Sequence, residues 1–123
     1  MDLPDAIDLC LTFPGAEETT PFGPDVLVYK VAGKIFALTD PGAFPPAMNL
    51  KCDPARSIEL RELHDAIRPG YHMNKRHWIT VRIDGSLPPA LLRDLISSSY
   101  RLVVASLTRK QRATLTHELR VES

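Results

Sequence analysis

The chain has few cysteines, only two in 123 residues, and no CxxC pair. Cys10 falls in a helix-like pattern of apolar residues, and Cys52 lies at the end of a strand-like one. A disulfide framework is therefore not expected, and neither is a cysteine-based metal site. The sequence instead predicts two buried thiols in a protein of the reducing cytoplasm.

Long hydrophobic runs are also absent. No apolar stretch approaches the ~18–20 residues that a membrane-spanning helix needs. The first residues include Asp2 and Asp5, where a secretory signal would have basic side chains. We therefore expect no membrane partner and a cytoplasmic location.

The chain has no excess of one charge, because 15 Lys and Arg residues balance 15 Asp and Glu residues. A zero net charge is unlike a strong non-specific DNA binder, whose domain is usually basic. The charges are unevenly spread, however. Residues 1–25 hold six acids and no Lys or Arg, residues 51–82 hold seven bases and four acids, and residues 101–120 hold five bases and one acid. This asymmetry allows one face to meet an anionic partner.

The length of 123 residues is typical of one domain, here 1–123, and no internal repeat divides it. Apolar spacing predicts a first helix from Leu3 to Leu11, capped by Asp2. A β-hairpin follows, with strands near 26–31 and 35–38 and Gly33 in the turn. A short strand is expected at 47–52.

The second half of the chain starts with a helix capped by Asp53, with Pro54 in its first turn. The β-branched segment 78–84 predicts a strand, and a long helix follows it. Thr108 and Gln111 fit the capping box of a last helix near 109–120. The apolar face of the Asp53 helix is predicted to be Ile58, Leu60, Leu63 and Ile67.

This order of elements favours an α+β fold, with an antiparallel sheet and helices packed on one face. The spacing leaves no room for repeated βαβ units. We expect a monomer.

The segment PGYHMNKRHW, at 69–78, concentrates side chains that carry chemistry. Its two histidines, His72 and His77, are five residues apart, so they point apart both on a strand and on a helix. No metal site is therefore predicted. The chain also lacks GxSxG, a glycine-rich phosphate loop and HExxH, so neither catalytic residues nor a cofactor are assigned.

Two interpretations of this segment remain open from the residues alone. Basic residues between flat rings are typical of a nucleic-acid surface. The alternation of side chains along a strand offers a simpler interpretation. In it Ile79 and Val81 are buried, while Trp78, Thr80 and Arg82 form the solvent-exposed face of a sheet. Lys75 and His77 break that alternation, which indicates a loop or bulge.

Four stretches together resemble the MmcQ/YjbR family, from about Ile7 to Arg112: CLTFPGAEETTPFGPDVLVYKVAGKIFAL, LKCDP, PGYHMNKRHWITV and SYRLVVASLTRKQR. The resemblance implies a CyaY-like α+β fold and a non-enzymatic DNA-binding role of the double-wing type, in which two projecting strand-loop elements meet double-stranded DNA. The wings implied here are the hairpin tip at 31–35 and the segment around 72–78.

On this resemblance Lys51, Lys75 and Arg76 would neutralise phosphates, and Trp78 would stack or support the loop. Relatives commonly have Asn after the Trp, whereas this chain has Ile79, which suggests packing against the core. Family-motif positions also include His72 and Met73. The full set of implied nucleic-acid-binding residues is Lys34, Lys51, Tyr71, Asn74, Lys75, Arg76, His77, Trp78 and Arg82.

Three other hypotheses compete with DNA binding. The YHMNKRHW segment could line the pocket of a small-molecule-binding protein or an unrecognised enzyme. The basic last helix could bind an acidic protein. Alternatively the segment could be purely structural, with its histidines bonded to the backbone and Trp78 anchored in the core. The directions of Lys75, His77 and Trp78 relative to the sheet distinguish these hypotheses.

Overall fold

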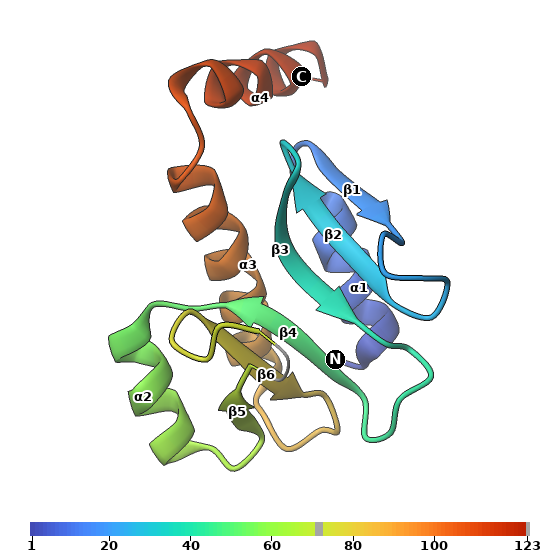
Figure 1. Ribbon diagram of the computed structural model, residues 1–123, viewed down its shortest axis with the longest axis vertical. Helices are drawn as coiled ribbons and strands as arrows, with labels where there is room; N and C mark the ends of the chain where they lie inside the picture. The colour runs from blue at the N-terminus through green and yellow to red at the C-terminus, as the bar shows by residue number, and fades with distance from the viewer. Residues whose placement is uncertain (71–72, 123) are drawn as a thin grey trace.

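A six-stranded antiparallel sheet lies against helices in the computed structural model, which describes residues 1–70 and 73–122 and the side chains of 1–70 and 73–115 (Figure 1). The strand order across the sheet is β1-β2-β3-β4-β6-β5. The strands are Ala16–Thr19 (β1), Leu27–Val31 (β2), Lys34–Thr39 (β3), Ala47–Lys51 (β4), Ile67–Pro69 (β5) and Trp78–Arg82 (β6). The helices are Leu3–Thr12 (α1), Pro54–Leu63 (α2), Pro89–Ala105 (α3) and Arg109–Glu122 (α4).

The core lies between the sheet and two of the helices, α1 and α3. Phe36, Ile79 and Ile96, from β3, β6 and α3, are each fully buried there. Helix α3 passes behind the sheet in Figure 1, while α2 flanks the β5 edge. The predicted α+β architecture, with an antiparallel sheet and helices on one face, is therefore confirmed.

Local capping fixes where three helices start, as the sequence predicts. Asp2 and Asp5 cap α1 reciprocally, each side chain accepting from the backbone N–H of the other. The Asp53 carboxylate accepts the Arg56 N–H, at 3.1 Å, at the start of α2. Thr108 and Gln111 form the expected box at α4. These contacts satisfy backbone donors that have no partner within the helix.

The prediction for the end of α2 was wrong. The helix stops at Leu63, and Ile67 belongs to β5, where it pairs with Val81 and is buried. Ile58 and Leu63, predicted as parts of an apolar face, are 53% and 68% exposed. Ile67 is buried where β5 pairs with β6, and a pattern read along the chain does not contain that long-range contact.

Strand β1 was not predicted at all, since its residues AEET are mostly polar. Among the strands that the structure describes, β1 is an edge strand that pairs only with β2, so a polar sequence is tolerated there.

The sheet has two different faces because side chains alternate along each strand. Tyr29, Leu50 and Ile79 point toward α1 and α3 and are buried. We call the side turned away from α1 and α3 the outer face. One row of paired residues crosses all six strands on it: Thr19, Val28, Leu38, Asn49, Thr80 and Arg68.

Within the described part of the chain, no helix has both the length and the apolar character to span a bilayer.

Candidate functional site

The loop that leads into β6 is organised by Asn74. Its backbone oxygen accepts the N–H groups of His77 and Trp78, at 3.1 and 3.0 Å. Its side-chain Oδ1 accepts the Arg76 N–H at 2.9 Å, an Asx-turn. The amide oxygen of Asn74 is thus engaged within the loop, which gives this residue a structural role beside the nucleic-acid contact that the family resemblance implies.

Two of the four stretches that resemble the family, LKCDP and PGYHMNKRHWITV, are direct neighbours in the structure. The Cys52 N–H donates to the His77 carbonyl oxygen at 2.8 Å, and Lys51 lies directly opposite Trp78 in the β4–β6 pair. Segments 51–54 and 73–78, separated by about twenty residues in sequence, therefore form one continuous surface element.

Glycine is required where the chain passes closest to Trp78. The Gly70 N–H donates to the Trp78 carbonyl oxygen at 2.9 Å. A Cβ on Gly70 would lie 2.7 Å from the Trp78 Cβ and 3.0 Å from its carbonyl oxygen. The absence of a side chain at Gly70 thus allows its backbone to approach β6, and the hydrogen bond to Trp78 holds it there.

Trp78 lies on the outer face and is only part-buried, whereas Ile79 is fully buried toward the helices. The expectation that Ile79 packs against the core is confirmed. Trp78 is on the opposite side of the sheet from that core, a position that favours a surface role over a core anchor.

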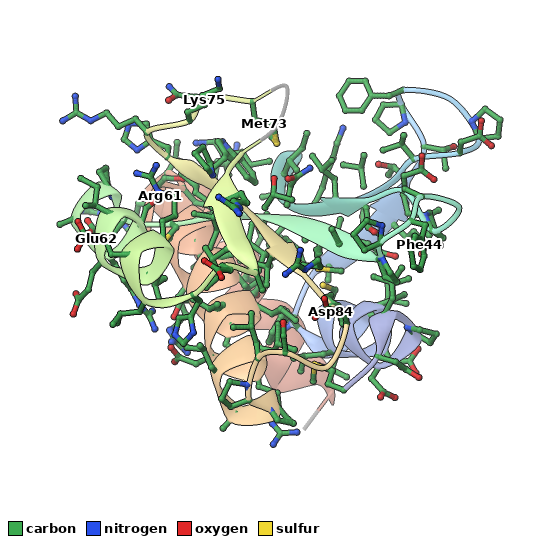
Figure 2. All side chains as sticks on the ribbon, turned by 90° about the horizontal axis from the view of Figure 1, so that it is seen from below. Phe44, Arg61, Glu62, Met73, Lys75 and Asp84 are labelled. Carbon is green, nitrogen blue, oxygen red and sulfur yellow. The ribbon has the colours of Figure 1, made fainter. Side chains whose placement is uncertain are left out.

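Cations gather around Trp78 from separate elements. Lys51 lies opposite it on β4, and Arg68 on β5 is one row further along the outer face. Lys75 and Arg76 are exposed in the loop. Figure 2 shows the labelled Met73 and Lys75 on the side of the sheet away from α1 and α3.

Figure 2 also shows a second projection on that side, the loop between β1 and β2 in light blue. The two loops rise at opposite ends of the sheet. Two raised loops therefore flank the outer face, although the second is not the hairpin tip that the sequence suggested as a wing.

Arg68 was missed by sequence reasoning. It was assigned to the end of a helix, and only strand pairing with Thr80 places it on the outer face. The signal that could have found it is the buried-exposed alternation of Ile67 and Arg68, which is too short to be decisive without the partner strand.

Two predicted residues lie apart from this cluster or are already paired. The Lys34 Nζ donates to the Ser106 carbonyl oxygen, at 3.3 Å, at the end of α3, so this side chain is on the helix side of the sheet. Arg82 is on the outer face, but its Nε lies 2.8 Å from the Asp84 Oδ2. Tyr71 and His72 lie outside the described residues.

The cysteines do not form a reactive site. Both are free and buried, as predicted. Burial raises the pKa of Cys10 to about 12, and burial likewise raises the pKa of Cys52. The thiolate is the nucleophilic form, so both groups are unreactive near neutral pH. Among the residues that the structure describes, no group of three His, Cys, Asp or Glu side chains could hold a metal ion.

A pocket of about 290 Å³ adjoins the cluster where β4 ends. Its walls come from residues 51–56 and from α3, and it shares Lys51 with the outer-face cluster.

Comparison with known proteins identifies the family of this chain. The YjbR family model matches residues 11–102, three quarters of the sequence. The chain belongs to the YjbR family. The uncharacterised proteins YbdF of Escherichia coli O157:H7 and YjbR of Escherichia coli K12 are 45% and 34% identical to it. These alignments cover 83% and 94% of this chain, and 84% and 98% of the relatives.

Solved structures of similar proteins agree with this YjbR-family assignment. The Deinococcus radiodurans protein DR2400, with a DUF419 domain, superposes with a TM-score of 0.87 at 40% identity, over 94% of this chain and 88% of that one. A Pseudomonas syringae protein superposes with a TM-score of 0.70 at 29% identity, over 83% and 98%. The fold is thus shared within the family, and none of these names states a function.

Proposed function

We propose that this YjbR-family protein is a non-enzymatic DNA-binding protein, acting as a single-domain cytoplasmic monomer. Double-stranded DNA is the proposed ligand. The observation that carries the proposal is the convergence of Lys51, Arg68, Lys75 and Arg76 around Trp78 on the outer face.

Charge compensation within the protein supports this choice of surface. Among the described residues, the ion pairs involve Arg56, Arg82 and Arg101. The four cations around Trp78 are not part of these pairs, so their charge is available to phosphates. Phosphate contacts of this kind provide most of the affinity of DNA-binding proteins and position the duplex.

The shape of the surface also suits a long ligand. The outer face lies between segment 73–77 and the β1–β2 loop, which both rise on that side (Figure 2). Trp78 lies directly opposite Lys51 and is part-buried, so it adds apolar contact area beside the cations that would meet the phosphates.

Fluorescence anisotropy with a labelled duplex, repeated across a salt series, tests the proposal. Contacts with three to four phosphates predict a log–log slope of about −3. Lys75→Gln and Arg76→Gln should each weaken binding and reduce the magnitude of the slope by about one.

Arg93→Gln is the matched control, because it removes the same charge from an exposed position on α3, on the other side of the sheet. It should leave both affinity and slope unchanged. Absence of binding to any duplex at low salt would refute the proposal. Equal losses in Arg93→Gln and Arg76→Gln would show that binding is not located on the outer face.

A further inference from the structure

We propose that the pocket beside the LKCDP segment binds a small organic carboxylate with an apolar body. The pocket lies between the end of β4, the start of α2 and the face of α3. This inference does not rest on DNA binding, although Lys51 belongs to both surfaces. Three properties of the pocket support it: its charge, its free donors and its apolar wall.

The charge around the pocket has an excess of one positive unit. Lys51, Arg56 and Arg101 line it, together with the Asp53 carboxylate. Asp94 pairs with both arginines from outside the lining, directly with Arg56 and at 3.8 Å with Arg101. Three cations against two carboxylates match a ligand with one negative charge.

Hydrogen-bond donors remain free to face the ligand. The Ser98 Oγ accepts from Arg56 Nη1 at 3.2 Å and from Arg101 Nη2 at 3.1 Å. A hydroxyl whose lone pairs are both engaged as acceptors still has its own proton to donate. Each guanidinium has five N–H donors, and the contacts with Ser98 and Asp94 use only some of them. The pocket therefore offers both a hydroxyl and guanidinium donors to a carboxylate.

The remaining wall is apolar. Leu95, Leu102 and Ala105 line it from α3, and the neutral thiol of Cys52 lines it from the start of the α2 segment. An inorganic anion would leave this wall without a contact, whereas a carboxylate on one or two rings would cover it. The volume, about 290 Å³, is just below the range of roughly 300–1,000 Å³ for small-molecule sites, so the ligand is small.

The part-exposed guanidinium of Arg56 is also fixed in place. Its guanidinium is held from two sides, by Ser98 and by Asp94, before any ligand arrives. Such preorganised donors lower the cost of ordering on binding.

The test is a ¹⁵N–¹H NMR titration of the full chain with 2-naphthoate and with its neutral analogue 2-naphthamide. Saturable shifts centred on Cys52, Arg56, Ser98 and Leu102 are expected with the carboxylate. The amide should bind at least about 10-fold more weakly, because it lacks the charge that strengthens hydrogen bonds to guanidinium. Similar affinities for the two compounds would overturn the proposal, as would the absence of saturable shifts with naphthoate.

Two variants locate the site. Arg101→Gln should weaken naphthoate binding by about 5–10-fold, whereas Arg93→Gln, on the same helix but outside the pocket, should not. Ala105→Phe should fill the pocket and abolish binding. If Ala105→Phe does not fold, the Arg101 and Arg93 pair decides, since both side chains are exposed and neither is in the core. Equal naphthoate affinities of Arg101→Gln and Arg93→Gln would show that binding occurs outside the pocket and would overturn the proposal.

Loss of DNA binding and loss of naphthoate binding are separable in these experiments. Lys75→Gln tests only the outer face, and Arg101→Gln tests only the pocket. Failure of one proposal therefore leaves the other intact.

Discussion

The two faces of this sheet are made by the same strands and differ in almost every physical respect. On the helix side, β6 contributes Ile79 and Val81, which are completely buried. On the outer face it contributes Trp78, Thr80 and Arg82, which are part-exposed. The two-residue period of β6 thus buries one set of side chains and leaves the other set part-exposed. The family motif around Trp78 spans this division, because it supplies side chains to both faces of the sheet.

The largest predicted difference between the two faces is in stability, and it comes from substituting the neighbouring residues Ile79 and Trp78 on β6. Ile79→Ala should lower the free energy of unfolding by about 3–4 kcal/mol, because it removes a fully buried side chain. Trp78→Ala should cost only about 1–2 kcal/mol, because the larger ring is part-exposed on the outer face. Urea unfolding of both variants measures this difference. A greater loss for Trp78→Ala would mean that the ring anchors the fold.

A second prediction concerns the loop held against β6. Gly70→Ala should destabilise by about 1–3 kcal/mol, because its Cβ would press into the Trp78 backbone and Cβ. Gly42→Ala is the matched control, since its Cβ would meet only Asp40 Oδ1 at an ordinary 3.5 Å. Thermal unfolding of the pair checks the close contact, and equal stabilities would contradict it.

Burial of Cys10 on the helix side of the sheet should make the free energy of unfolding depend on pH. The Cys10 pKa is raised to about 12 from 9.0, so the folded state keeps a proton that the unfolded chain releases above pH 9. Stability from this group is complete below pH 9 and is lost as the pH rises toward 12. Between pH 8 and pH 10 the expected loss is about 1 kcal/mol.

Urea unfolding at several pH values measures this loss. Cys10→Ala should show a weaker decline over the same range, whatever its stability at pH 8. A decline as steep as that of the unmodified protein would assign the effect to other groups.

The smallest predicted effect comes from neutralising one lysine on each side of the sheet. Lys34→Gln should cost a few tenths of a kcal/mol to about 1 kcal/mol, because Lys34 interacts with the carbonyl end of α3. It should leave DNA affinity unchanged, unlike Lys75→Gln. Unfolding and anisotropy measurements on the same two variants provide the check. Similar affinity losses would extend the DNA surface to the hairpin tip.

Much of the fold could be predicted because its signals are local. Asp2, Asp53 and Thr108 cap helices within three residues of themselves, and Gly33 makes a tight turn. The alternation of β4 and β6 is also local, so the burial of Ile79 followed from its neighbours.

The prediction failed where partners are distant. Ile67 and Arg68 continue a helical pattern in the sequence, but pairing with Val81 and Thr80 makes them a strand. The polar strand β1 exists only because β2 lies beside it. The pocket unites Lys51 with Arg101, fifty residues further along, and no spacing rule connects them.

By itself the sequence determined the helix boundaries set by caps, the alternation of the central strands and the membership of the YjbR family, because each depends on residues that are close in sequence or on a contiguous motif. Only the tertiary structure decided that Arg68 joins Lys51 and Trp78 on the outer face, and that Lys34 does not. The physical reason is that strand pairing and helix packing are long-range contacts, which assign a side chain to a face only when the partner is in place.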